Sequence, residues 1–365
     1  MMKIALVDSF FSGSHKKWGL DLQKFCNYPI HIFSMYGVHW KWRMHGGAIT
    51  LAKQINDTKI KFDIFLVTDM VDISVFKALI SNKNKSTPII MYFHENQIMY
   101  PKSKLDTDIK DKRDNHYGFI NFTSALAADK VIFNSKFHFV EFLNNLKTFL
   151  NQFPDYSIQN EAKKIKDKSM VIPLGVDFTN IKYQNKSNKI KNLLWNHRWE
   201  YDKNPNQFFK ILFKLDNEGI NFKINIIGQK YRGYPKIFDE AKNRLKNKIN
   251  NWGFANSLQE YNRILSHSDI LPVTSYHDFF GLSTVEAISN GVIPLLPNRL
   301  AYPEHVPKSV QNKFLYNSND DFYTKLKNLI INYEEFKTND IKDHISKYDM
   351  KIVIKKYEEC FERIS

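Results

Sequence analysis

Short apolar runs alternate along the chain with amphipathic stretches of helical period. The runs that predict buried strands are 4–7, 30–33, 62–67, 88–93 and 130–133, and then 192–195, 223–227, 270–273 and 291–296. The helices predicted between and after them include 18–25, 120–127, 208–215 and 258–266, with a last helix over 348–364. Strand–helix alternation is typical of α/β domains with parallel sheets. The two series therefore predict two doubly wound domains.

One strand exit combines two kinds of ligand-binding group. The stretch His277–Glu286 follows an apolar run and leads into a predicted helix that starts near Ser283 or Thr284. Backbone amides at a helix N-terminus bind phosphate oxygens. The carboxylates of Asp278 and Glu286 accept hydrogen bonds from sugar hydroxyls. Together they favour a nucleotide-sugar site, and the alternative is an ordinary turn with two solvated acids.

Polar residues also follow other predicted strands. The sequence His-Glu-Asn-Gln occupies 94–97 after the fourth strand, Ser-Gly-Ser-His occupies 12–15 after the first, and Gly228 ends the strand over 223–227. Because the carboxyl ends of parallel strands meet at one sheet edge, these residues are expected to line a ligand site. A lone histidine is more often structural, but an acid and an amide beside His94 favour a role in a site.

Two basic residues follow the first strand of the second series. Arg198 and Lys203 lie five residues apart in the loop between that strand and its helix. A guanidinium and an ammonium in such a loop can hold a diphosphate leaving group, and the alternative is a solvated charged loop. Because these side chains supply positive charge, no metal is expected. The two cysteines, Cys26 and Cys360, match no metal-binding spacing.

The composition is that of a globular chain. It has 365 residues, 43% of them hydrophobic and 25% charged, a length that suits two domains that each bury a core. No apolar run approaches the length of a membrane span, and the N-terminus lacks the layout of a signal peptide. With only two cysteines, a reducing cytoplasm is the expected compartment.

The chain has a formal net charge of +15. This charge suits a polyanionic partner, but mixed Lys and Asn tracts such as 82–85 also fit a purely compositional origin. The segment over Trp40, Lys41, Trp42 and Arg43 interleaves aromatic and basic side chains, as base stacking with phosphate contact requires. The alternative is that these aromatic residues pack beneath a loop.

Several sequence blocks resemble one glycosyltransferase family. They are Ser-Gly-Ser-His at 12–15, Tyr-Phe-His-Glu-Asn-Gln at 92–97, Val-Ile-Phe-Asn-Ser at 131–135, the stretch from Trp195 to Pro205, His-Asp-Phe-Phe-Gly at 277–281 and Tyr-Pro-Glu at 302–304. These blocks resemble the tRNA-queuosine α-mannosyltransferase family, whose acid-x7-acid turn is that of retaining GT-B glycosyltransferases. Two departures are Asp278 where the family has Glu and Ser12 where it more often has Gly.

The resemblance implies an architecture and a reaction. The GT-B fold has two Rossmann-like domains facing a cleft, expected here at 1–175 and 176–345, with a C-terminal helix over 346–365 packing back on the first domain. The family implies transfer of a hexose, mannose from GDP-mannose, to the queuosine nucleoside of tRNA with retention at the anomeric carbon. Neither an added cofactor nor a metal is implied.

The resemblance also implies roles for individual residues. Arg198 and Lys203 would neutralise the departing nucleoside diphosphate, Glu286 would accept from the ribose hydroxyls, and Asp278 would hold the donor sugar. The other residues implied around the donor are the backbone of Phe280, Gly281 and Leu282, His94 beneath the sugar near the anomeric carbon, and Gly13 and His15 from the first domain. No side chain is implied as a nucleophile, so catalysis would rest on positioning and leaving-group stabilisation.

The acceptor leaves alternatives open. A tRNA acceptor fits the net charge and the Trp40–Arg43 segment, with Glu95, Asn96 and Gln97 as further acceptor-side candidates. A lipid or polysaccharide glycosyltransferase at a membrane surface would want a basic amphipathic helix in the first domain, and 137–149 is the nearest stretch. A third hypothesis is a non-catalytic RNA-binding module on a GT-B scaffold.

Overall fold

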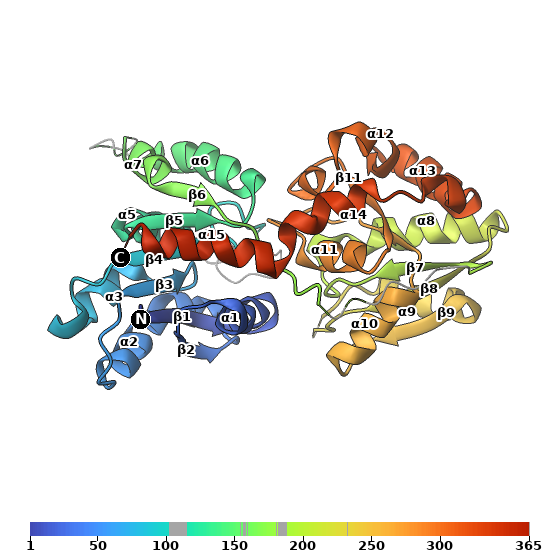
Figure 1. Cartoon of the computed structure of the whole chain (residues 1–365). Helices are drawn as coiled ribbons and strands as arrows, with labels where there is room; N and C mark the ends of the chain where they lie inside the picture. Colours follow the sequence, from blue (N-terminus) through green and yellow to red (C-terminus); the bar gives the residue numbers. More distant parts are fainter. Residues whose placement is uncertain are drawn as a thin grey trace. The chain divides into compact units, whose positions relative to one another are not determined.

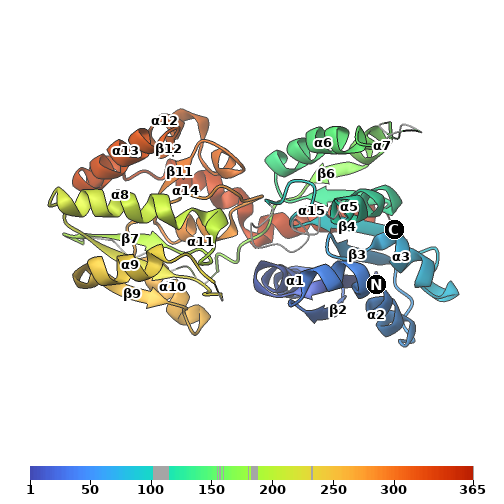
Figure 2. The same ribbon diagram turned by 180° about the vertical axis from the view of Figure 1, so that it is seen from behind.

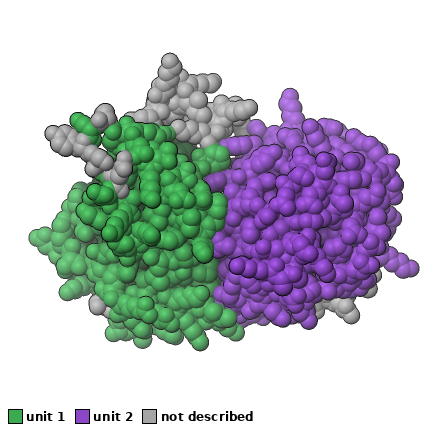
Figure 3. Space-filling view, turned by 90° about the horizontal axis from the view of Figure 1, so that it is seen from above, with its two compact units in different colours: residues 1–175, 350–365 green, residues 176–349 purple. Residues whose placement is uncertain are grey.

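The computed structural model describes residues 1–101, 115–153, 155, 158, 160–179, 181, 188–231 and 233–364. The chain forms two compact units, coloured separately in Figure 3. Unit 1 comprises residues 1–175 and 350–365, and unit 2 comprises residues 176–349. Each unit is an α/β domain built on one parallel sheet, as the alternating pattern predicts.

The sheet of unit 1 has six parallel strands in the order β2-β1-β3-β4-β5-β6 (Figure 1). They are β1 (Ile4–Phe11), β2 (Ile30–Tyr36), β3 (Ile64–Thr68), β4 (Ile89–Phe93), β5 (Lys130–Phe133) and β6 (Ser169–Val171). Adjacent strands are in register through pairs such as Leu6 with Leu66 and Val67 with Met91. The register brings the carboxyl ends of β1, β3 and β4 to one edge of the sheet.

Helices cover both faces of this sheet. They are α1 (Gly13–Phe25), α2 (Trp40–Asn56), α3 (Ile73–Leu79), α5 (His116–Ala127), α6 (Lys136–Leu150), α7 (Glu161–Asp167) and α15 (Met350–Glu362). Helices α2, α3, α5, α6 and α7 send apolar side chains into one core cluster. Helices α1 and α15 contact each other on the opposite face, and α15 accordingly lies in front in Figure 1 and behind in Figure 2.

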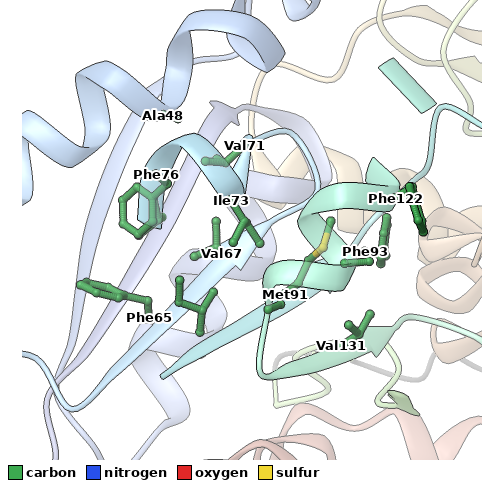
Figure 4. Close-up of a cluster of buried hydrophobic side chains, with 14 of the residues drawn as sticks. Ala48, Phe65, Val67, Val71, Ile73, Phe76, Met91, Phe93, Phe122 and Val131 are labelled. Atoms are coloured by element: carbon green, nitrogen blue, oxygen red, sulfur yellow. The ribbon is translucent and has the colours of Figure 1, made fainter. Parts of the chain in front are cut away.

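The core of unit 1 follows from the apolar strands. Inward side chains such as Phe65, Val67 and Met91 meet Phe76 from α3 and Phe122 from α5 (Figure 4). All of these side chains are buried. Burying a side chain of this size stabilises the fold by about 1.5–3 kcal/mol. This packing makes the sheet a rigid support for the polar residues at its edge.

The last helix returns to unit 1, as the fold prediction has it. Tyr357 on α15 accepts a 3.0 Å hydrogen bond from Trp18 Nε1, and Glu358 accepts one from the backbone of Asn27. The helix begins at Met350, later than predicted. The residues just before it, Ser346–Tyr348, form a 3-10 turn that belongs to unit 2.

Unit 2 repeats the architecture with the strand order β12-β11-β10-β7-β8-β9, again all parallel. The strands are β7 (Lys191–Trp195), β8 (Phe222–Ile227), β9 (Ile249–Gly253), β10 (Ile270–Pro272), β11 (Ile293–Pro297) and β12 (Leu315–Tyr316). The helices are α8 (Pro205–Asn217), α9 (Ile237–Arg244), α10 (Leu258–His267), α11 (Leu282–Ser289), α12 (Gln311–Phe314), α13 (Asn319–Ile331) and α14 (Asp340–Ile345). Aromatic residues of α8 and α9 pack on the sheet with α13.

Some local expectations need correction. Strand β9 lacks the apolar pattern of a buried strand because Asn250 and Asn251 occupy its centre. The stretch Trp40–Gly47 is the start of α2 rather than a loop. Helix α11 starts at Leu282 with Gly281 as its N-cap, and no side chain caps it. Within the described residues, no helix combines the length and the hydrophobicity of a membrane span.

Candidate active site

The loop after β7 presents one of its two basic side chains to solvent. Arg198 is 43% exposed, and its guanidinium lies 3.1 Å from Glu200 and 3.8 Å from Asp202. The acids hold the guanidinium at the carboxyl edge of the sheet. The trajectory of this loop depends on Gly228 at the end of β8, because a Cβ there would lie within 1.9 Å of the His197 carbonyl oxygen. The structure therefore gives Gly228 a packing role.

The second basic side chain is buried among acids. Lys203 Nζ lies 3.2 Å from Asp202 and 3.3 Å from Asp278, and it donates a 2.8 Å hydrogen bond to the His277 carbonyl. Burial alone would lower the pKa of Lys203, but Asp278 and Asp202 raise it. Burial would likewise raise the pKa of Asp278, but Lys203 holds it well below its usual range. Lys203 and Asp278 therefore form a pair that stays charged near neutral pH.

Side chains from a later segment of unit 2 hold the turn between β10 and α11 in place. Tyr302 donates to Asp278 at 3.1 Å, and His305 Nε2 donates to the Phe280 carbonyl. Burial lowers the pKa of His305 to about 4, so the imidazole is neutral. Gly281 has φ = 85°, and a Cβ there would approach Tyr302 at 3.1 Å. The structure thus brings the predicted turn residues together at a helix N-terminus, where backbone amides can bind an oxyanion.

A hydrogen-bonded relay orients the second acid of the turn. Tyr261 on α10 donates a 2.9 Å hydrogen bond to Glu286 Oε2. Asn196 donates to the Tyr261 hydroxyl at 3.3 Å and to the Ser283 carbonyl at 2.8 Å. The Tyr261 hydroxyl is buried, and burial raises its pKa well above the usual value. Tyr261 therefore stays a donor and restricts the orientation of the Glu286 carboxylate.

Unit 1 places a second polar cluster at the ends of β3 and β4. The backbone N–H of His94 donates a 2.8 Å hydrogen bond to Asp69 Oδ1. Burial lowers the pKa of His94 well below its usual value, and the nearby His15 lowers it further. His94 is therefore neutral. The Nε2 atom of His94 and the Oδ2 atom of Asp69 are buried with no hydrogen-bond partner among the described residues.

A protonated histidine stacks on this neutral one. The His15 and His94 rings lie 3.9 Å apart at an angle of 25°. His15 Nδ1 lies 3.0 Å from Oδ2 of Asp8, a residue within β1. Burial would lower the pKa of His15, but the Asp8 carboxylate raises it to about 9. Gly13 is the first residue of α1, the helix that carries His15, and no other group lies within 4 Å of where its Cβ would be.

The segment after His94 is held by a buried polar chain. Asn96 Nδ2 donates to His138 Nε2 at 2.8 Å, so His138 carries its proton on Nδ1 and donates to Asn134 Oδ1, also at 2.8 Å. Asn134 then donates to the His94 carbonyl at 2.9 Å. Asn96 is fully buried, which gives it a positioning role. Glu95 is half-buried and accepts a 3.0 Å hydrogen bond from Gln97.

The structure divides the aromatic and basic segment at the start of α2. Trp40 packs 5.0 Å from the ring of Tyr117, with the Lys41 ammonium 5.6 Å above the Trp40 ring. Trp42 points outward and is 73% exposed. Arg43 donates to the carbonyl of Tyr36, whose own ring is 85% exposed. The groups of this region that face outward are therefore the Trp42 ring on α2, the Arg43 guanidinium beside it and the Tyr36 ring.

The sequence pattern did not identify several residues of these clusters as site residues. Asp69 follows an apolar strand in the same way as His94, so the same signal could have identified it. Tyr261 and His305 carry no local signal, because tertiary folding alone brings them to the turn. As for metals, no group of three His, Cys, Asp or Glu side chains suited to a metal ion occurs among the residues described.

Comparisons with known proteins agree with this arrangement. The family profile of the tRNA-queuosine alpha-mannosyltransferase N-terminal region matches residues 3–176, and that of glycosyl transferases group 1 matches residues 177–344. The chain is 32% identical over 336 residues to a tRNA-queuosine alpha-mannosyltransferase of Drosophila melanogaster, covering 89% of this chain and 86% of that protein.

Solved structures show the same fold at low identity. HepE of Anabaena, crystallised with UDP and glucose, is 15% identical with a TM-score of 0.71, and the match covers 100% of both chains. Sucrose-phosphate synthase of Thermosynechococcus elongatus is 11% identical with a TM-score of 0.73, over 100% of this chain and 99% of that one. These likenesses establish a GT-B fold. With the sequence matches, they show that the chain is a glycosyltransferase and belongs to the tRNA-queuosine alpha-mannosyltransferase family.

Proposed function

We propose that the protein transfers mannose from GDP-mannose to the queuosine nucleoside of tRNA, with retention of the anomeric configuration. The similarity to the Drosophila tRNA-queuosine alpha-mannosyltransferase over most of both chains carries the proposal. Donor binding is assigned to unit 2, and acceptor binding to unit 1.

The unit 2 cluster suits a nucleoside diphosphate. The exposed Arg198 guanidinium can form paired hydrogen bonds with phosphate oxygens, and Lys203 adds a fixed positive charge. Both would stabilise the negative charge that grows on the leaving group as the glycosidic bond breaks. Glu286, oriented by Tyr261, would accept from the ribose hydroxyls. The backbone of Phe280, Gly281 and Leu282 would contact the donor, with Asp278 on the sugar.

We propose that the anomeric configuration is retained because the side chains position the substrates, without a covalent intermediate on the protein. We assign no nucleophile, and the diphosphate itself would flank the oxocarbenium-like state on the side from which it leaves. The place of His94 beneath the donor sugar remains a prediction from the family resemblance, as do the donor-side roles of Gly13, His15 and Gly228. The neutral state of His94 would suit hydrogen bonding to a sugar hydroxyl.

The acceptor side is supported by the start of α2. Trp42 and Tyr36 expose rings on which an unpaired base could stack, and Lys41 and Arg43 add positive charge beside them. The competing membrane hypothesis needed an amphipathic surface helix over 137–149. In the structure, Phe142, Leu146 and Phe149 of that helix are core residues, so its apolar face is occupied.

The test is nucleoside mass spectrometry after incubation of the purified protein with queuosine-containing tRNA. Separate reactions would receive GDP-mannose, UDP-glucose and other nucleotide-sugars, with tRNA lacking queuosine as the control. We expect a hexose on queuosine from GDP-mannose alone, and the anomeric proton coupling of the product would report retention. If the protein bound the donor but added no hexose to any nucleoside, the proposal that tRNA is the acceptor would be overturned. Transfer from another donor would overturn the assignment of GDP-mannose.

A further inference from the structure

A buried histidine directly precedes the exposed arginine in the loop after β7. His197 is 4% exposed, and its ring stands edge-on to the Trp195 indole, with 5.4 Å between the ring centroids. Its carbonyl accepts a 2.9 Å hydrogen bond from Trp195 Nε1, and a Cβ on Gly228 would lie 1.9 Å from the same oxygen. The backbone of His197 is therefore held from two sides before any ligand binds.

The protein uses one nitrogen of this ring and leaves the other unpaired. His197 Nδ1 lies 3.1 Å from the hydroxyl oxygen of Ser283, which belongs to the first turn of α11. His197 Nε2 is buried and has no hydrogen-bond partner among the described residues. Buried polar atoms are nearly always paired in native proteins. An unpaired nitrogen at the carboxyl edge of a parallel sheet therefore indicates a ligand.

The residue before His197 shows the same pattern. Asn196 donates to the Ser283 carbonyl and to the Tyr261 hydroxyl, but its own Oδ1 atom is buried and has no partner in the described part of the chain. Both unpaired atoms thus belong to side chains that hydrogen-bond to Ser283, near the N-terminus of the eight-residue helix α11. Backbone amides at this end of a helix attract anions. Two neighbouring side chains and a helix end therefore point to the same ligand.

The charge state of the ring limits what Nε2 can do. Burial lowers the pKa of His197 to about 4, and the nearby Lys203 lowers it further, so the imidazole is neutral near neutral pH. A neutral imidazole carries one proton, on either Nδ1 or Nε2. When the Ser283 hydroxyl donates to Nδ1, the proton lies on Nε2. This nitrogen is then a donor that suits a phosphate oxygen.

We propose that His197 binds the diphosphate of the nucleotide-sugar, with Nε2–H donating to a phosphate oxygen while Ser283 holds the ring through Nδ1. The inference rests on the proposed function for the diphosphate alone and adds a residue to its binding site. The order of groups along the loop supports it. Asn196 offers an acceptor that suits a ribose hydroxyl, His197 offers a donor, and Arg198 offers a charged donor. The groups change from acceptor to donor as a nucleotide changes from ribose to phosphate.

Two substitutions separate this role from a purely structural one. In His197→Asn the amide can take the place of Nδ1 and keep the bond to Ser283, but no group remains at the position of Nε2. In His197→Gln the longer side chain can place its amide at the position of Nε2, and the bond to Ser283 is lost. Calorimetric titration with GDP should show that His197→Asn raises Kd by about ten- to a hundredfold, the range of a charge-assisted hydrogen bond. The increase in His197→Gln should be about threefold or less.

The controls are a ligand without phosphate and a histidine outside the site. The Kd for guanosine should stay within about twofold in both variants. His267→Asn should leave GDP binding unchanged, because His267 also approaches a serine hydroxyl through Nδ1 but is exposed at the end of α10. Normal GDP binding by His197→Asn would overturn the inference. So would equal losses in the two His197 variants, or a loss for guanosine as large as that for GDP.

A second measurement observes the ring in the unaltered protein. Long-range ¹H–¹⁵N spectra of protein with labelled histidine would report which nitrogen carries the proton, and the signal of His197 is the one that disappears in His197→Gln. We expect the proton on Nε2, and we expect GDP to shift the Nε2 signal while guanosine does not. A proton on Nδ1 in the GDP complex, or an Nε2 signal that GDP leaves unchanged, would overturn the inference.

These measurements need no tRNA, so they can fail separately from the proposed function. The expected His197 effects without sugar transfer to queuosine would support the inference while overturning the proposed acceptor. Conversely, confirmed mannose transfer with normal GDP binding by His197→Asn would overturn the inference alone. UDP and uridine would be titrated in parallel, and if the protein binds UDP rather than GDP, the same comparison with that pair decides the inference.

Discussion

Units 1 and 2 share a parallel sheet with polar residues at its carboxyl edge, but they neutralise their buried acids differently. In unit 2 the acids face lysine and arginine, so Asp278 stays ionised beside Lys203. In unit 1, His15 pairs with Asp8, and burial raises the pKa of Asp69 to about 8 although the nearby His15 lowers it in part. One site therefore carries charge that is fixed across the physiological range, whereas the other exchanges protons near neutral pH. The same topology can carry both kinds of site, because the residues at the strand ends can differ while the apolar core that forms the fold stays the same.

The largest expected effect tests the fixed charge. Arg198→Ala should lower kcat/KM for sugar transfer by about 100- to 1,000-fold, because the leaving diphosphate loses a charged donor. Its side chain is 43% exposed, so the melting temperature should change little. Steady-state kinetics with the nucleotide-sugar would measure the effect, and Lys210→Ala on the exposed face of α8 is the control. Near-normal transfer by Arg198→Ala would break the assignment of the diphosphate to unit 2.

Neutralising one acid in each unit should change stability in opposite directions. Asp278→Asn should lower the free energy of unfolding at pH 7 by about 1–3 kcal/mol, because Lys203 loses a buried partner. Asp69→Asn should raise it by about 1 kcal/mol, because burial disfavours the ionised carboxylate and an amide does not ionise. The asparagine keeps an oxygen for the His94 amide. Denaturant unfolding of both variants would measure the two changes.

The pH dependence of these changes follows from the two pKa shifts. The pKa of Asp278 is lowered in the folded state, so its contribution is present at neutral pH and is lost as pH falls toward the folded value. Burial raises the pKa of Asp69 to about 8. Between about pH 4 and pH 8 the unfolded chain has therefore lost this proton while the folded chain keeps it, so the fold becomes less stable as pH rises. The gain in Asp69→Asn should therefore grow with pH over that window. Changes of the same sign would contradict the contrast between the units.

A smaller effect is expected at the relay of unit 2. Tyr261→Phe removes the donor that orients Glu286. The KM for the nucleotide-sugar should rise about three- to tenfold, the range of one hydrogen bond, with little change in kcat. Tyr323→Phe is the matched control, since Tyr323 also donates to a carboxylate, Glu218, on the exposed surface. A fall in kcat with an unchanged KM would show that Tyr261 acts on the transition state instead.

The smallest expected effect is none at all. Because arginine and lysine supply the positive charge of unit 2, we expect excess EDTA to leave the rate of sugar transfer within about twofold of the untreated rate. The rate would be measured with and without EDTA, and after adding back Mg²⁺ or Mn²⁺. Loss of activity that a divalent ion restores would mean that the fixed charge of the side chains is not sufficient.

The sequence reveals much of this architecture because the signals are local. Apolar runs identify the strands, and a polar residue after a strand identifies an edge position such as His94 or Arg198. Strand β9 escapes prediction because asparagines at its centre bond across the sheet, as Asn251 does with Asn225. The relay from Tyr261 to Glu286 also escapes, because residues that are 25 positions apart meet only through folding. The charge state of Asp69 depends on burial, which no local pattern reports.

The return of α15 to unit 1 has a consequence for synthesis on the ribosome. Unit 2 is made before α15, so unit 1 stays incomplete while its partner folds. Until α15 arrives, Trp18 lacks the Tyr357 hydroxyl that accepts from its indole, and the edge of this indole contacts His94. A nonsense mutation just before Met350 would spare every residue of unit 2 yet remove this support from the histidine cluster. Such a truncated chain should still bind nucleotide while losing the order of the other site.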